Sequence, residues 1–316
     1  MQNFYIQNSI SISELFDIFL TKQKIWDKKE ATIKAYKCLC QKFVDFIGKD
    51  TLTENIDSDL FDKYSLMLKE RPTVNDVSRE TYLRHARVLL YFGRDNGYIR
   101  PDLKLKITKA VAKLKTPHTD NEIENLTEEV NIRKCTFAEY RNWITVWWIL
   151  SYGSRSGTIR HLKIKHIKFD TGNVIIPNEK GKTEYILPLT SFMREILRQY
   201  IIYRKPKTEE DFLFSNPYGE QLTADAIKNS FQKYCKKREV KNTSLHNLRH
   251  YFAKEHYLKN KDILMLKLIM GHKDISTTER YINLLVGQIF NNYETDVPAT
   301  KFMKRKVEKI KLKKQA

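Results

Sequence analysis

Residues 243–256, TSLHNLRHYFAKEH, and residues 269–284, IMGHKDISTTERYINL, contain the polar pattern that decides the fold of this 316-residue chain. His246 and Arg249 stand three positions apart, so a helix through the first stretch presents the imidazole and the guanidinium on one face. His272 follows Arg249 by twenty-three positions, and Tyr281 follows His272 by nine. We therefore expect these four side chains to form one site.

The residue types in this set suit an attack on a phosphodiester. Arginine offers a planar fork of permanently protonated donors to the negative charge that develops on the non-bridging oxygens. Tyrosine offers a hydroxyl nucleophile whose oxygen can hold the phosphate covalently. Because the cationic side chains supply the charge stabilisation that Mg²⁺ provides elsewhere, and the tyrosine retains the bond energy, we expect no metal, ATP or other cofactor.

Two stretches upstream extend the pattern. In WILSYGSRSGTIRHL, residues 148–162, Arg155 follows a predicted buried helix, and in NEKGKTEYILPL, residues 178–189, Lys180 lies on a predicted β-hairpin. With these additions the chain resembles the tyrosine recombinases and phage integrases. The catalytic residues that this resemblance implies are Arg155, Lys180, His246, Arg249, His272 and Tyr281.

The resemblance also implies a role for each residue. Tyr281 attacks the scissile phosphate and forms a 3′-phosphotyrosyl link, while the two arginines stabilise charge and His272 donates a hydrogen bond. Lys180 protonates the leaving 5′ oxygen, with Lys182 on the same loop as the alternative, and His246 orients or deprotonates. The chain departs from the family at Thr158, where a glutamate commonly supports the first arginine, because a threonine supplies no countercharge.

The implied fold is mainly α and of the DNA breaking-rejoining enzyme type. It consists of an N-terminal helical core-binding (SAM-like) domain and a mixed α+β catalytic domain with a small three-stranded sheet. The expected parts are a core DNA-binding domain at 1–105, a basic linker at 106–126, a catalytic domain at 127–293 and a basic tail at 294–316.

Hydrophobic periodicity predicts the elements within this frame. Capping boxes are expected at Thr51-x-x-Glu54 and at Ser276-x-x-Glu279, the second starting the helix with Tyr281. Helices are predicted at 12–24, 32–47, from Asp57 or Ser58 through Leu68, from 78 to about Gly93, and at 138–152, 191–203, 223–237, 244–258 and 263–270; strands are predicted at 164–169, 173–176 and 184–189.

A net charge of +19 and a pI near 9.5 make nucleic acid the first candidate partner and a membrane surface the second. We expect double-stranded DNA with a specific recombination site and no membrane, because no apolar run approaches about twenty residues. The alternative for the basic residues is a solvated surface. The expected DNA contacts are Arg79, Arg84 and Arg87 on one helix face, Lys104, Lys106, Lys109, Lys113 and Lys115 near the linker, and Lys182.

The tail from 301 to 316 holds eight Lys or Arg and one Glu. It is either a solvated basic extension or, as the resemblance implies, a segment that docks on a neighbouring protomer in a tetramer on DNA. The four cysteines form no C-x-x-C pair and the N-terminus shows no secretory signal, so we expect reduced thiols in the cytoplasm.

Rival functions remain open at this point. A type IB topoisomerase-like enzyme shares the pocket but only nicks and reseals, and a non-catalytic DNA-binding protein shares the fold. A metal-dependent transposase or nuclease is weaker, because no carboxylate constellation accompanies the tyrosine. Helical sequence from about residue 12 favours a two-domain, Xer-like recombinase or a small integrase of a mobile element. The outcome, whether integration, excision or dimer resolution, stays open.

Overall fold

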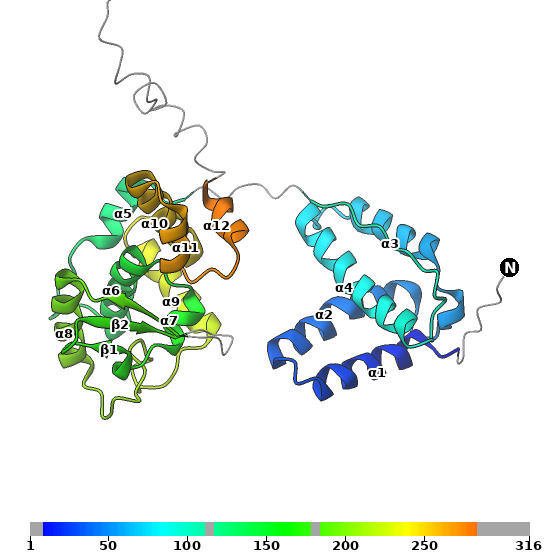
Figure 1. The fold of residues 1–316 in the computed structure, drawn as a ribbon, viewed down its shortest axis with the longest axis horizontal. Coiled ribbons are helices and arrows are strands. Elements are labelled where there is room, and N and C mark those ends of the chain that lie inside the picture. Colours follow the sequence, from blue (N-terminus) through cyan, green and yellow to red (C-terminus); the bar gives the residue numbers. More distant parts are fainter. Residues whose placement is uncertain (1–8, 111–116, 178–183, 283–316) are drawn as a thin grey trace, which may run out of the picture. The chain divides into compact units, whose positions relative to one another are not determined.

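A computed structural model of the chain describes residues 9–110, 117–177 and 184–282 (Figure 1). The chain divides into two units, Met1–Lys113 and Leu114–Ala316. Each unit has a hydrophobic core of its own. The fold is mainly helical with one small sheet, as the sequence predicts.

Over residues 9–110, the first unit is a bundle of four helices with a short 3₁₀ turn, coloured blue to cyan in Figure 1. Its core is rich in aromatic side chains, including Phe19, Phe43, Phe61 and Tyr64, which are almost fully buried. Because these side chains recur at helical spacing, each helix turns one apolar face inward. The elements are α1 (Ile12–Ile25), α2 (Glu30–Ile47), η1 (Thr53–Asn55), α3 (Ser58–Glu70) and α4 (Asp76–Asp95).

The segment Pro101–Ala110 runs antiparallel to α4 along the surface of that helix. Leu103 and Leu105 are buried in the core of the first unit, while Lys104 and Lys106 between and after them are exposed. This alternation has the period of an extended chain, with one side against the bundle. The bonds that hold the segment run from Arg94 Nη1 to Leu103 O at 3.3 Å, from Leu105 N to Tyr91 Oη at 3.1 Å and from Ala110 N to Glu80 Oε2 at 2.8 Å.

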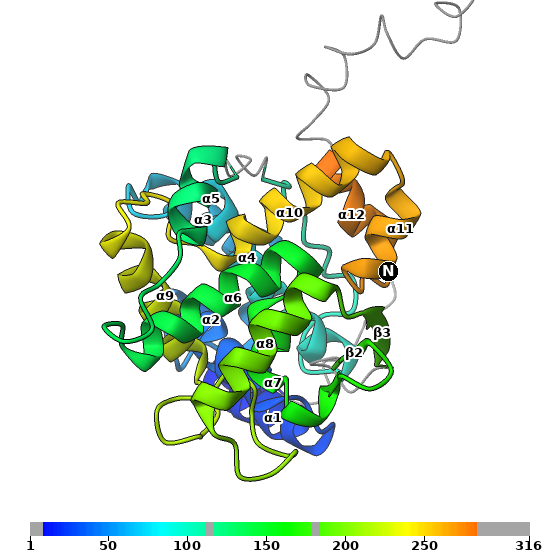
Figure 2. The same cartoon turned by 90° about the vertical axis from the view of Figure 1, so that its left-hand side faces the viewer.

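The second unit is built around α6, which is apolar on nearly every side. Ile144, Trp148 and Ile149 of α6 are fully buried, and helices α5, α8, α9 and α10 pack around it (Figure 2). The helices are α5 (Asp120–Thr127), α6 (Phe137–Tyr152), α7 (Ser156–His161), α8 (Ser191–Arg204), α9 (Ala224–Lys237), α10 (Leu245–Asn260), α11 (Ile263–Ile269) and α12 (Ile275–Ile282).

The sheet of this unit has three antiparallel strands in the order β1-β2-β3. They are β1 (Ile167–Lys168), preceded by the 3₁₀ turn η2 (Ile164–His166), β2 (Asn173–Ile176) and β3 (Tyr185–Pro188). In the register, Ile167 pairs with Val174 and Ile175 with Ile186. Residues 178–183, which connect β2 to β3 and include Lys180 and Lys182, lie outside the described residues.

Both predicted capping boxes are wrong. Thr51 does not start a helix: its hydroxyl donates to the Ile47 carbonyl at 2.6 Å and so closes the end of α2. α12 begins at Ile275, which puts Ser276 inside the helix rather than at its cap. The S/T-x-x-E pattern therefore marks no helix start at Thr51 or Ser276.

Other differences concern short or connecting segments. The strand predicted at 164–169 is shortened because Ile164–His166 forms η2, and α7 has no predicted counterpart. Both ends of the predicted linker 106–126 are packed on a unit. Ile107 lies against the first core, and the last residues form α5, whose Ile123 and Leu126 are buried in the second core. Eight residues are too few for periodicity to reveal such a helix.

Among the described residues, no helix combines the length and the apolar character that crossing a membrane requires.

Gly153 ends α6, and the effect of a substitution there depends on how tightly α6 packs against α10. Its φ of +56° is left-handed, and an added Cβ would collide with the ring of Phe252 on α10. Gly219 has φ +88° but no atom within 4 Å of its Cβ position. We expect Gly219→Ala to reduce the free energy of unfolding by about 1 kcal/mol through backbone strain alone, and Gly153→Ala by about 1–3 kcal/mol more through the collision.

Urea unfolding of the two variants beside the unsubstituted chain measures this difference. Equal destabilisation of both variants would show that α10 moves away from α6 without loss of stability.

Candidate active site

A pocket of about 410 Å³ opens where the loop after α6, helix α7, the start of α9 and the start of α10 meet. We call it the arginine pocket. His246 and Arg249 both line it, as their spacing in α10 predicts, and Arg155 joins them from the end of the loop after α6. The full lining is Ser154, Arg155, Ser156, Gly157, Arg160, Ala224, Leu245, His246 and Arg249.

Arg249 is buried at the base of the pocket and is extensively hydrogen-bonded. Only 2% of it is exposed, and its guanidinium donates to three acceptors from different parts of the unit. Nη1 donates to the carbonyl of Gly153, and Nη2 donates to the carbonyl of Met270 at 3.1 Å and to Nε2 of His272 at 2.6 Å. A planar fork with fixed acceptors leaves little rotational freedom, so the charge is held in one place.

His272 is buried beside this guanidinium in its neutral form. Burial, followed by the charges of Arg249 and Arg155, lowers the pKa of His272 from 6.5 to about 3. A guanidinium has no acceptor, so Nε2 accepts from Arg249 and the ring proton lies on Nδ1. That N–H donates to the hydroxyl of Thr278 on α12, with 2.8 Å between Nδ1 and Oγ1. The histidine therefore connects the pocket to α12.

Arg155 differs from Arg249 in its exposure. It occupies the N-cap position of α7 and is exposed, and its Nη1 donates to the Met270 carbonyl at 3.5 Å. Within the described part of the chain, no carboxylate lies within ion-pair distance of Arg155, and Thr158 is buried on α7. The polar partner described for Arg155 is thus a backbone carbonyl, which carries no countercharge.

The turn before His272 is held by β3. Gly271 has φ +61°, and a Cβ there would lie 2.7 Å from the ring of Tyr185. The hydroxyl of Tyr185 donates to the Ile269 carbonyl at 3.2 Å, and burial raises its pKa. The strand that follows residues 178–183 therefore contacts the turn that positions His272.

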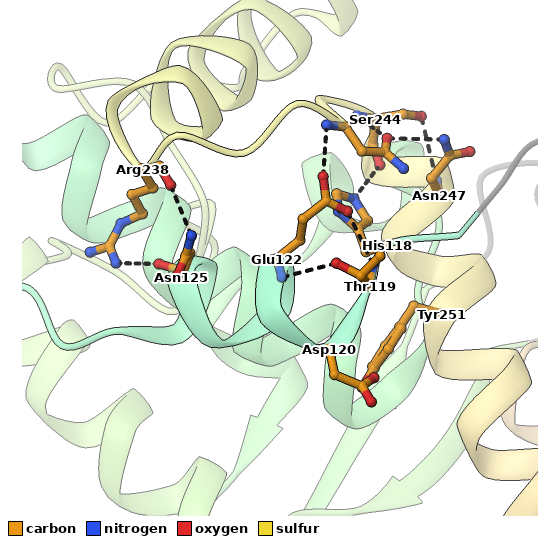
Figure 3. A network of polar contacts seen from close by, with 10 residues as sticks. His118, Thr119, Asp120, Glu122, Asn125, Arg238, Ser244, Asn247 and Tyr251 are labelled. Atoms are coloured by element: carbon orange, nitrogen blue, oxygen red, sulfur yellow. Dashed lines mark hydrogen bonds and ion pairs between the residues drawn. The ribbon is translucent and has the colours of Figure 1, made fainter.

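A second network holds the start of α10 (Figure 3). His118 is buried and its Nε2 donates to the Ser244 carbonyl at 3.4 Å, while the hydroxyl of Tyr251 donates to Asp120 at 2.9 Å. The network is completed by bonds from Asn242 N to Glu122 Oε1 at 3.1 Å and from Asn247 Nδ2 to Asn242 Oδ1 at 3.0 Å. α5 thereby fixes the turn of α10 that carries His246.

This geometry has counterparts among known proteins. A model of the phage integrase family matches residues 118–287, which is more than half of the chain. The chain belongs to the phage integrase family. It is a tyrosine-type site-specific recombinase.

Curated relatives cover most of the recombinase. The tyrosine recombinase XerA of Saccharolobus solfataricus is 24% identical over 284 residues, 89% of this chain and 91% of the relative. The tyrosine recombinase XerD of Staphylococcus aureus is 27% identical over 273 residues, 83% of this chain and 90% of the relative. The solved structure of the XerH site-specific recombinase bound to a palindromic difH substrate matches with a TM-score of 0.69 at 22% identity, covering 89% and 84%, and shares the fold.

The described residues bring together Arg155, His246, Arg249 and His272. Tyr281 belongs to α12, but its side chain is not among those that the structure describes. Lys180 and Lys182 lie outside the described residues. Sequence reasoning did not identify the carbonyls of Gly153 and Met270 or the side chains of Tyr185 and Thr278. Backbone acceptors have no signature in the side-chain pattern, and Thr278 gave no signal beyond its position in the Tyr281 helix.

The predicted DNA contacts of the first unit lie on or beside α4. Arg79 pairs with Asp76 at 3.1 Å, and Arg84 pairs with Glu80 at 2.5 Å. Arg87 lies 5.9 Å from the centre of the Tyr91 ring. Lys104, Lys106 and Lys109 are exposed on the segment that follows α4 back, and Lys113 and Lys115 lie outside the described residues.

Within the described ranges, no group of three or more His, Cys, Asp or Glu side chains is arranged to hold a metal ion.

The buried neutral His272 predicts a pH dependence of stability. The pKa of His272 is lower in the folded chain than in the unfolded chain. Between about pH 6.5 and pH 3, only the unfolded chain therefore binds a proton at this residue. The stabilisation that neutral His272 gives to the fold is complete above about pH 6.5 and is lost as the pH falls towards 3. We expect His272→Gln, which accepts from Arg249 but does not titrate, to lose less stability between about pH 7 and 4 than the unsubstituted chain.

Urea midpoints of the two proteins across this range measure the difference. His118, His166 and His256, whose pKa values are also lowered by burial, are present in both proteins and cancel. Parallel pH profiles would contradict the buried neutral state of His272.

Proposed function

We propose that the recombinase cleaves duplex DNA by attack of Tyr281 on a scissile phosphate, which forms a 3′-phosphotyrosyl link that is later resealed. The observation that carries this proposal is the arginine pocket. Two guanidiniums and an imidazole converge on an open space of about 410 Å³, and one of the guanidiniums is fixed by three acceptors. Donors that are already in place stabilise developing charge without reorganisation during the reaction.

The two arginines divide this work. Arg249 supplies a fixed positive charge, and the exposed Arg155 approaches the same phosphate from the solvent side. His246 is exposed in the pocket, with its ring 4.4 Å from that of His250, and orients or deprotonates the nucleophile. His272 donates a hydrogen bond to the phosphate from Nε2 when that nitrogen carries a proton.

Lys180 protonates the leaving 5′ oxygen in this scheme. An ammonium delivers a proton faster than water does, and the loop after β2 is the position at which the family carries its lysine. Lys182 of the same loop is the alternative.

The basic face of the first unit is the proposed DNA-binding surface. Bonds between the segment Pro101–Ala110 and α4 bring exposed lysines beside the arginines of that helix. A net charge of +19 attracts the phosphate backbone over longer range. In the proposed domain plan, residues 1–105 bind the core of the recombination site, 106–126 connect, 127–293 catalyse and 294–316 form the tail.

Recombination exchanges four strands, so we place the active form as a tetramer on DNA. The exposed side chains of Leu264, Met265 and Leu268 on α11 support a protein contact, since three adjacent apolar side chains seldom remain in water on a monomer. The basic tail 301–316 is the proposed segment that reaches a neighbouring protomer. The proposed place of action is the cytoplasm, where the free thiols stay reduced.

The product distinguishes the biological roles. A recombinase of a mobile element integrates or excises, a Xer-like enzyme resolves dimers, and a topoisomerase-like enzyme only relaxes circles. Sequencing the DNA trapped covalently on the protein in cells identifies the site and with it the role.

We expect Tyr281→Phe to abolish covalent attachment to a suicide duplex while DNA binding survives, because one hydroxyl is lost from the ring. Tyr218→Phe is the matched control, since Tyr218 is 88% exposed and lies outside the arginine pocket. A normal covalent band from Tyr281→Phe would refute the assignment of Tyr281 as the nucleophile.

Arg155→Ala and Arg249→Ala should each slow cleavage of the suicide duplex by about a hundredfold or more, the scale of a lost oxyanion donor.

The role of Lys180 is tested with a 5′-bridging sulfur, whose thiolate leaves without protonation. We expect this substrate to restore cleavage by Lys180→Ala but not by Arg249→Ala, because only the first variant lacks the general acid. Lys182→Ala should behave as the unsubstituted enzyme on both substrates. Failure of Lys180→Ala on the sulfur substrate, together with rescue of Lys182→Ala, would move the role to Lys182.

A further inference from the structure

Thr278 is the most deeply buried residue described on α12. None of its surface is exposed, although its side chain is polar, and its Oγ1 lies 2.8 Å from Nδ1 of His272. Thr278 also lies three positions before Tyr281, so one helical turn separates it from the proposed nucleophile. A buried hydroxyl bonded to a catalytic-site histidine contributes more than volume to the core.

We propose that Thr278 is a positioning residue for DNA cleavage, whose hydroxyl orients His272 and, through the same bond, fixes α12 and its Tyr281 against the arginine pocket. The inference rests on the roles proposed above for His272 and Tyr281.

The hydroxyl suits this position because it both donates and accepts. Without DNA, Nε2 of His272 accepts from Arg249, so Nδ1–H donates to Oγ1. To donate to a phosphate oxygen, Nε2 must carry a proton. In the imidazolium, taken up from solvent, Nδ1–H still donates to Oγ1; in the neutral Nε2–H tautomer the hydroxyl turns and donates to Nδ1. A carbonyl in place of Oγ1 would accept from Nδ1–H, but it could not donate to Nδ1 in the neutral Nε2–H tautomer.

The bond also links helices that assemble the site. α12 packs against α10, which carries Arg249, and against α11, which leads into the turn of His272. The chain of contacts therefore runs from Gly153 through Arg249 and His272 to Thr278. A phosphate that draws Arg249 or His272 towards itself acts on α12 through this chain.

The test compares three threonine variants in single-turnover cleavage of a suicide duplex at saturating DNA. Thr278→Val keeps the volume and removes the hydroxyl, and we expect cleavage to slow by about 10- to 100-fold, the range for removing a partner that orients an active-site histidine. Thr278→Ser keeps the hydroxyl and loses the methyl, and should cleave within about threefold of the unsubstituted enzyme. Thr277→Val makes the same chemical change one residue away and should have no effect.

A slow Thr278→Ser variant or a slow Thr277→Val variant would overturn the proposal, because packing of α12 rather than the hydroxyl would then set the rate. Thermal unfolding of each variant confirms that it is folded at the assay temperature. If Thr278→Val is unfolded there, the Ser variant still decides between hydroxyl and packing.

A double-mutant cycle with His272→Ala separates this proposal from the proposed function. If Thr278 acts through His272, Thr278→Val slows the His272→Ala enzyme no further, whereas multiplied effects would overturn the inference. Normal cleavage by Thr278→Val beside slow cleavage by His272→Ala would refute the inference and leave the role of His272 intact. Normal cleavage by His272→Ala would refute that role and the inference together.

Discussion

The hydrogen bonding of the buried Arg249 guanidinium is the interaction on which the second unit depends. Removing an arginine from water is expensive unless its donors are paired, so the structure must bring acceptors to it. The acceptors described are two backbone carbonyls and a neutral imidazole, contributed by the end of α6, the turn after α11 and His272. None of these carries a negative charge. The site consequently keeps its positive potential for a phosphate, although three acceptors hold the two Nη groups of the guanidinium.

The same arrangement explains the state of His272. Two cationic neighbours and burial hold its pKa far below the ordinary range. A phosphate that enters the pocket adds the opposite charge within a few ångströms, which favours the protonated imidazole. Under the proposed function, phosphate binding therefore raises the pKa of His272, and the imidazolium donates from both nitrogens. The neutral state of His272 and its proposed bond to a phosphate thus both depend on the buried Arg249.

The sequence predicted those features that follow from periodicity or from side-chain type. The aromatic faces of α1 to α4, the cap at Asp57 and the shared face of His246 and Arg249 all appear as expected. It could not predict acceptors that are backbone carbonyls, because any residue supplies one. It also missed α5 and α7, which are too short for a periodic signal, and the alternating burial at Leu103 and Leu105, which occupies too few residues to stand out. The capping boxes failed because a four-residue pattern takes no account of tertiary packing.

The contrast between the two arginines also gives meaning to Thr158. A carboxylate behind Arg155 would fix that side chain and neutralise part of its charge, whereas a threonine and the Met270 carbonyl carry no negative charge. Arg249 is then the buried, bonded guanidinium of the pocket and Arg155 the exposed one. Arg155 and Arg249 both donate to the carbonyl of Met270, in the turn that precedes His272. The two side chains are therefore linked through one shared acceptor. The bond from the buried Arg249 to the Met270 carbonyl thereby limits how far the acceptor of Arg155 can move.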